Sequence, residues 1–170
     1  MSRLIRGCLR LGAAVGVVVI GSSLSAIALA QGSSPTLPPG HACRLLEAAD
    51  FEEAGLKQGN AKPDKTISGT QCTWDPVLGA GGFLHIQTMG KVQFEKRRQR
   101  AVEADAKKSD RAGGAMVSLK GLGDDAFVQK WKPNETITVR SGDKAFHISG
   151  NARLKQEQLE SLARAVLARL

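Results

Sequence analysis

Apolar residues recur along this chain at two periods, and each period predicts one type of secondary structure. Steps of three and four residues predict a helix at the carboxyl end, with its apolar face at Leu159, Leu162, Ala163, Val166, Leu167 and Leu170. A second helix is predicted over residues 91 to 108, which contain neither Gly nor Pro. Its apolar stripe is thin and consists of Val92, Phe94, Ala101, Val102 and Ala104. A third, short helix begins near residue 42, docks through Leu45, Leu46 and Phe51, and ends at Gly55.

The two-residue period predicts the strands. They cover residues 70 to 74, 83 to 89, 115 to 119, 126 to 131, 136 to 140 and 144 to 149. Turns rich in Gly, Pro and Asp separate them, and the polar residues 58 to 68 are predicted to form a loop. Along the chain the predicted elements are a helix, two strands, a helix, four strands and a final helix. This order predicts an α+β fold, in which helices cover an antiparallel sheet.

The first 30 residues have the pattern of a cleaved secretory signal peptide. A basic start with Arg3, Arg6 and Arg10 precedes an apolar run, which ends in the small residues Ala28 and Ala30. Residues 31 to 40 are rich in Ser, Pro and Gly and predict a flexible linker, so that residues 41 to 170 form a single domain. The alternative is an uncleaved inner-membrane anchor, because residues 11 to 30 are long enough to span a bilayer.

The predicted export determines whether the cysteines are expected to form a disulfide. Cleavage would remove Cys8 and leave Cys43 and Cys72, which in an oxidising compartment are expected to form one disulfide. That bond would tie the first helix to the first core strand. Cys8 precedes the apolar run, so lipid anchoring through a cysteine is not expected.

Charge and length are those of one small basic domain. The chain carries 24 Lys+Arg against 16 Asp+Glu, a net charge of +8, which falls to +5 without the three arginines of the signal segment. This mild excess suits either solubility or contact with anionic envelope surfaces.

Several short motifs together resemble a known group of proteins. The motifs are Cys43-Arg44-Leu45-Leu46, Cys72-Thr73-Trp74 and Gly121-Leu122-Gly123-Asp124-Asp125, followed by a Leu-rich terminal helix. This pattern is similar to small secreted bacterial envelope proteins and lipoproteins of unknown function, and covers nearly all of residues 41 to 170. The resemblance implies an envelope location and a PsbP-like α/β sandwich, and it implies no catalytic residue.

The residues that could carry metal-binding or acid/base chemistry also fit structural roles. A metal set of His41, Cys43, Cys72, His85 and His147 lacks the close ligand pairs of structural zinc sites, so no metal or other cofactor is expected. Strand alternation sends His85 and His147 to one polar face, where they are predicted to be surface residues. Asp124 and Asp125 either form an acid/base pair or simply shape a turn, and the turn is preferred.

Two groups of residues are predicted to contact ligands. The basic run Lys96, Arg97, Arg98 and Arg100 is a candidate contact for an anionic glycan, lipid headgroup or protein, or else a solvated helix face. The aromatics Trp74, Phe83, Phe127 and Trp131 are candidates to line an apolar pocket between the layers. Nucleic acid is not expected as a partner, because aromatic residues do not interleave with the basic run.

These observations favour a periplasmic or extracellular, noncatalytic binding or accessory domain of the bacterial cell envelope. Its partner would be an envelope protein or a small apolar or anionic ligand, with peripheral membrane contact possible and a monomeric state expected. The alternatives are a small secreted hydrolase built on the aspartates and histidines, and a secreted inhibitor or accessory subunit with an exposed apolar patch.

Overall fold

The computed structural model describes residues 37 to 170, except 67–68, 79–80, 107–114, 132–133 and 152, and for Lys65 and Trp131 only the backbone. The predicted signal peptide and residues 31 to 36 of the predicted linker lie outside this part. None of the described helices is long and apolar enough to cross a membrane.

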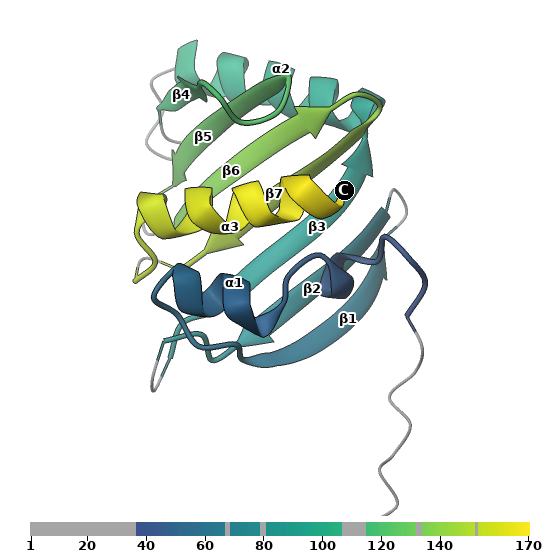
Figure 1. Ribbon diagram of the computed structural model, residues 1–170. Helices are drawn as coiled ribbons and strands as arrows, with labels where there is room; N and C mark the ends of the chain where they lie inside the picture. Colours follow the sequence, from purple (N-terminus) through teal and green to yellow (C-terminus); the bar gives the residue numbers. More distant parts are fainter. Residues whose placement is uncertain (1–36, 67–68, 79–80, 107–114, 132–133, 152) are drawn as a thin grey trace, which may run out of the picture. The chain divides into compact units, whose positions relative to one another are not determined.

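One antiparallel sheet of seven strands organises the domain (Figure 1), in the order β1-β2-β3-β7-β6-β5-β4. Its strands are β1 (Asn60–Thr66), β2 (Gly69–Asp75), β3 (Leu84–Gly90), β4 (Met116–Leu119), β5 (Asp125–Trp131), β6 (Asn134–Ser141) and β7 (Lys144–Gly150). The helices are the 3-10 turn η1 (Ala42–Arg44), α1 (Ala48–Glu53), α2 (Lys91–Ala106) and α3 (Gln156–Arg169). The predicted α+β class, an antiparallel sheet with helices packed on it, is confirmed.

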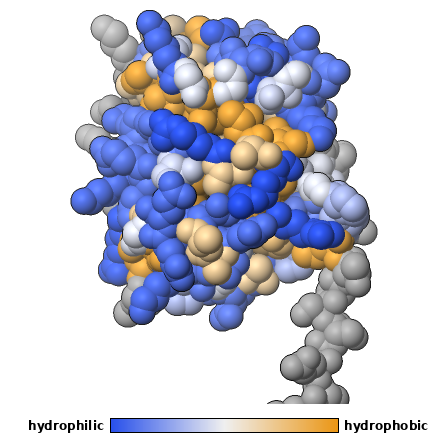
Figure 2. Space-filling model, in the orientation of Figure 1, coloured by the Kyte–Doolittle hydropathy of each residue, from blue (hydrophilic) through white to orange (hydrophobic). Residues whose placement is uncertain are grey.

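The larger core lies on the sheet face covered by η1, α1 and α3. Alternate strand residues such as Cys72, Trp74 and Ile86 are fully buried there, because side chains one residue apart point to opposite faces. From α3, Leu159, Leu162, Ala163 and Val166 complete this core. Figure 2 shows this side of the molecule, where polar side chains of the helices lie outermost and apolar atoms are visible between them.

The predicted disulfide joins Cys43 of η1 to Cys72 of β2, with a Cα–Cα distance of 5.0 Å. It connects the first helical segment to the sheet next to Trp74, whose ring lies 5.7 Å from that of Phe51. A structural disulfide is typical of proteins outside the reducing cytoplasm, so this bond indicates a non-cytoplasmic compartment.

A smaller core lies on the opposite face, beneath α2. Phe94 and Ala101 of α2 pack there against Phe127 of β5 and Ala145 of β7, and the rings of Phe94 and Phe127 are 5.8 Å apart. Val92 and Val102, predicted in the apolar stripe, are instead 63% and 49% exposed. A 100° step per residue points both away from the face defined by Phe94 and Ala101, which is why they stay in water.

The prediction of a loop over residues 58 to 68 is wrong, because residues 60 to 66 form strand β1. It is the edge strand of the described sheet and pairs with β2, in a register that sets Pro63 opposite Cys72. An edge strand tolerates proline and polar residues because one of its sides needs no hydrogen-bond partners. Its stability therefore comes from pairing with β2 and not from an apolar pattern.

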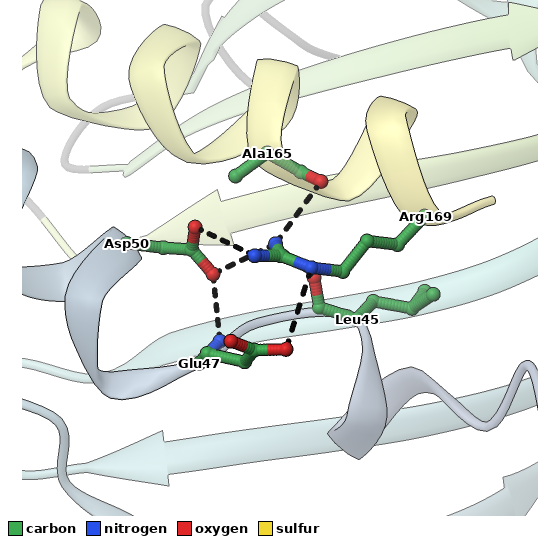
Figure 3. A network of polar contacts seen from close by, with 5 residues as sticks. All are labelled: Leu45, Glu47, Asp50, Ala165 and Arg169. Atoms are coloured by element: carbon green, nitrogen blue, oxygen red, sulfur yellow. Dashed lines mark hydrogen bonds and ion pairs between the residues drawn. The ribbon is translucent and has the colours of Figure 1, made fainter.

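The carboxyl-terminal helix is tied to α1 by one arginine (Figure 3). The guanidinium of Arg169 donates to both carboxylate oxygens of Asp50, at 2.8 and 3.1 Å, and lies 3.7 Å from Glu47. It also donates to the carbonyl oxygens of Leu45 and Ala165. Arg169 therefore joins two helices that are about 120 residues apart in the sequence.

The predicted turn before β5 is confirmed. Gly121 and Gly123 both have positive φ, 74° and 65°, a backbone conformation that favours glycine. A Cβ atom on Gly123 would also lie 2.4 Å from the carbonyl oxygen of Arg140, so any other residue here would force the backbone to shift. The carboxylate of Asp124 accepts a hydrogen bond from the backbone N–H of Gly142 at 2.7 Å, which fastens this turn to the turn between β6 and β7.

Candidate binding site

The sheet face that carries α2 presents a polar patch across four adjacent strands. Two neighbouring rows of the strand register hold polar side chains only: Thr136, Ser149, His85 and Thr73 in one row, and Thr138, His147, Gln87 and Gln71 in the next. Antiparallel sheets often leave one face in water. Here, however, the side chains of Thr138 and His147 are buried, so part of the patch is not an ordinary solvated surface.

Two histidines lie together in this patch. His85 of β3 and His147 of β7 have ring centroids 5.4 Å apart with planes inclined by 34°. The Nδ1 atom of His85 is 3.1 Å from the hydroxyl of Thr73. The Nδ1 atom of His147 is buried and has no hydrogen-bond partner among the described residues, and the same is true of the hydroxyl of its register neighbour Thr138.

Arg97 of α2 lies above the histidines. It is half-buried, and one of its Nη atoms is 3.5 Å from the Oε1 atom of Gln87. Among the described residues no carboxylate forms an ion pair with Arg97. The nearby Arg100, one turn further along α2, lowers the pKa of Arg97 in addition to the larger effect of burial. Arg97 is therefore a partly desolvated cation without a counter-charge in the described part of the chain.

The same cation and the same burial act on the histidines. Burial, then Arg97 and then His85 lower the pKa of His147 to about 3. Burial, followed by the charge of Arg97, also lowers the pKa of His85 below its ordinary value of 6.5. Each factor disfavours the protonated imidazole, so both rings are neutral at pH 7 and Arg97 supplies the charge of the group. We call His85, Gln87, Arg97 and His147 the His–Arg cluster.

The other charged residues on this face are engaged elsewhere. Asp125 lies 3.1 Å from Arg98, and Arg140 lies 3.4 Å from Asp124 and 4.0 Å from Glu95. On the outer strands, Asp64 accepts from Gln71 and Asp75 lies 4.0 Å from Lys62. The described acidic groups of this face thus have partners other than Arg97.

The predicted basic run does not act as one patch. Lys96 and Arg100 are exposed, whereas Arg98 pairs with Asp125 of β5 and Arg97 reaches Gln87 of β3. Steps of 100° along the helix spread the four side chains around its circumference. The sequence contained a signal for this arrangement. Arg97 and Arg98 each lie three or four residues from both Phe94 and Ala101, so both flank the buried stripe of α2.

The histidines share one face, as strand alternation predicts, but the prediction that both are surface residues is wrong for His147. Its side chain is only 7% exposed. The reason is tertiary, since α2 crosses this face of the sheet and contacts both β3 and β7. No local feature of the strand residues 144 to 149 distinguishes a histidine beneath a helix from one in water.

The four aromatics predicted to line a pocket are not brought together. Trp74 is fully buried on the α1 and α3 side and Phe127 on the α2 side, so the sheet lies between them. Phe83 is 36% exposed, just before β3. The side chain of Trp131 is outside the described part. The described aromatics therefore serve separate packing positions rather than one cavity.

The residues considered for catalysis or metal binding have other partners or lie apart. Asp124 and Asp125 make separate contacts, with Gly142 and Arg98, as expected for a turn. The side chain of His41 accepts from the backbone of Cys43, which is itself in the disulfide. In the part of the chain that the structure covers, no three His, Cys, Asp or Glu side chains are grouped to hold a metal ion.

Comparison with known proteins adds no family: no family model, curated protein or solved structure matches this chain.

Proposed function

We propose that this protein is a noncatalytic binding domain that acts in the bacterial periplasm or outside the cell, and that it binds its ligand at the His–Arg cluster. The observation that carries the proposal is Arg97, a half-buried cation without an acidic partner among the described residues, held next to the unpartnered Nδ1 of the buried His147. Folded proteins seldom leave buried polar groups unpaired without a functional reason.

The location part of the proposal has two supports. The first 30 residues have the three-part pattern of a secretory signal. The Cys43–Cys72 disulfide is of the kind that persists in oxidising compartments. The resemblance of the cysteine and Gly-Leu-Gly-Asp motifs to small envelope proteins agrees with both.

The chemistry of the cluster favours binding over hydrolysis. The contact of His85 with the Thr73 hydroxyl has the form of a base beside a nucleophile, but a working pair needs a third group that orients the imidazole. Among the described residues, His85 contacts the Thr73 hydroxyl and no carboxylate. Arginine, amide, hydroxyl and imidazole groups on a rigid sheet and helix are instead suited to recognising a polar ligand.

The experiment is a thermal-shift screen of the mature exported protein with a small panel of defined compounds. The panel contains sulfate, inorganic phosphate, glycerol 3-phosphate, acetate, N-acetylglucosamine and the dipeptide D-alanyl-D-alanine. Binding at the cluster predicts that at least one compound raises the Tm of the wild type and of Arg100→Gln but not of Arg97→Gln. The Arg100→Gln variant is the matched control, because it removes one exposed arginine from the same helix.

Three results would overturn the proposal. The first is that no compound raises the Tm of the folded wild-type protein. The second is an equal shift in wild type and Arg97→Gln, which would place binding elsewhere. The third is cleavage of a compound during incubation, detected by mass spectrometry, which would favour the hydrolase alternative.

A further inference from the structure

We propose that the ligand of the His–Arg cluster is an oxyanion, a phosphate- or sulfate-like group held by the guanidinium of Arg97 and the imidazole of His85, and that its binding takes up a proton. This inference rests on the function proposed above and names the chemical class of the ligand.

The first argument is charge. Arg97 lies at the polar patch with Arg100 one turn away, and none of the described acidic groups on this face pairs with it. A partly desolvated guanidinium gains most from an ion that matches its planar fork of donors, and phosphate and carboxylate oxygens do so. A bound oxyanion would supply the counter-charge that the described chain does not.

The second argument is the set of neutral groups around Arg97. Within the patch, the Thr73 hydroxyl, the Gln87 amide and the imidazole of His85 can each donate to an anionic oxygen. The buried Nδ1 of His147 and the hydroxyl of Thr138 add two polar groups that lack a hydrogen-bond partner in the described part of the chain. An oxyanion offers several acceptor oxygens in different directions, which suits such a set better than a ligand with a single polar group.

The third argument excludes cations as ligands. A divalent metal ion at the two histidines would be repelled by Arg97, the group that already disfavours their protonation. Two imidazoles without a third ligand among the described residues also fall short of the usual ligand set for zinc. The electrostatic potential at the cluster is therefore positive, and it favours a negatively charged ligand.

Proton uptake follows from the same field. Arg97 is the charged group that acts on both histidines. The other charged groups on this side of the sheet are Arg100 from α2, Arg140 from β6 and, on the outer strands, Lys62, Asp64 and Asp75. From β5, Asp125 is paired with Arg98. An anion beside Arg97 would offset the cation that now lowers the histidine pKa values, so these pKa values rise on binding. By linkage, affinity must then increase as the pH falls.

Sulfate is the probe, because it stays a dianion between pH 5 and 8 and its own titration cannot cause the pH effect. Titration calorimetry on the wild-type protein at constant ionic strength should show affinity at about pH 5.5 several-fold higher than at about pH 7.5. Repeating the titration in two buffers of different ionisation enthalpy should show net proton uptake.

The variants separate the roles of the residues. Arg97→Gln should weaken sulfate binding by about tenfold or more, whereas Arg100→Gln should change it by less than about threefold. Arg97→Lys keeps the charge but loses the fork, and it should bind with intermediate affinity, which tests the site even if Arg97→Gln folds poorly. His85→Gln should weaken sulfate binding more at pH 5.5 than at pH 7.5, and should therefore lose most of the pH dependence.

Further titrations distinguish the possible sources of the anion. Inorganic phosphate and glycerol 3-phosphate test a free ligand, and vesicles containing phosphatidylglycerol test a lipid headgroup, with phosphatidylcholine vesicles as the neutral control. No binding of any of these anions to the folded protein, or equal binding to wild type and Arg97→Gln, would overturn the inference. If N-acetylglucosamine alone bound, and Arg97→Gln abolished that binding, the oxyanion inference would fail while the proposed function survived.

Discussion

Acid should destabilise this protein through His147. Its imidazole is buried next to His85 and below Arg97, and its pKa is lowered to about 3, whereas in the unfolded chain it returns to the ordinary 6.5. Between these two values the unfolded state binds more protons than the folded state. Stability is therefore complete above about pH 6.5 and decreases as the pH falls toward about 3.

The size of the effect follows from the two pKa values. The linkage relation gives a loss of about 2.7 kcal/mol at pH 4.5 and about 0.2 kcal/mol at pH 7, a difference of about 2.5 kcal/mol. Small domains have a net stability of about 5 to 15 kcal/mol, so the loss is large enough to measure. His85 acts in the same direction, but it contributes less because its side chain is only partly buried.

The assay is urea denaturation at pH 7, 6, 5 and 4.5 in buffers free of sulfate and phosphate, with the disulfide intact. The variant His147→Gln removes the titrating group and keeps a polar side chain. The unfolding free energy of His147→Gln at pH 7 need not equal that of the wild type. Between pH 7 and 4.5, however, this free energy should fall by about 2.5 kcal/mol less in the variant than in the wild type. His85→Gln should show a smaller difference of the same sign.

Parallel stability profiles for the wild type and His147→Gln would refute the reasoning. A direct check is the NMR titration of the imidazole resonances. The signals of His147 should stay at their neutral positions down to about pH 4.5 in the folded protein. A midpoint near 6.5 would show that the ring is not desolvated.

Three structural features give further predictions. Reducing the disulfide between Cys43 and Cys72, which are separated by 29 residues, should lower the unfolding free energy in urea by about 3 to 4 kcal/mol. Gly123→Ala should cost at least about 1 kcal/mol more than Gly121→Ala, because both have positive φ but only Gly123 lies against a backbone carbonyl. Arg169→Ala should lower stability by about 1 to 2 kcal/mol, since it removes the bidentate contact between α3 and α1.

Matched variants control these predictions. A chain with both core cysteines replaced by serine should not respond to the reductant, which separates the loss of the bond from other effects of reduction. Arg164→Ala removes an exposed pair with Glu160 within α3 and should cost less than about 0.5 kcal/mol. Equal losses for Arg164→Ala and Arg169→Ala, or for the two glycine variants, would contradict the roles assigned here.

Local patterns determined the larger part of the fold. The spacing of Leu159, Leu162 and Val166 predicts α3 and its buried face, because any helix places these residues on one side. Alternation likewise predicts the inward side chains of β2, β3 and β7. The glycines of the turn before β5 mark their own positions, since they adopt a backbone conformation that other residues disfavour.

The errors occurred where an element depends on its neighbour. Strand β1 has no apolar alternation, and its existence rests on pairing with β2, so its sequence reads as a loop. The buried face of α2 was misjudged because a thin stripe allows more than one way of docking. In the structure that face is defined by Phe94, Ala101 and Ala104, with Val92 and Val102 in water.

For the candidate site too, local sequence patterns predicted one part and tertiary packing decided the other. The sequence by itself determined the export pattern, the pairing of Cys43 with Cys72, and the placement of His85 and His147 on one face of a sheet. The signal pattern and the two-residue alternation of a strand can each be recognised in a short stretch of sequence. Only the tertiary structure decided that the two histidines lie side by side and that Arg97 lies above them. Those facts depend on the pairing of β3 with β7, some sixty residues apart, and on how α2 docks across them. Burial and pKa values arise from that packing, which no short stretch of sequence contains.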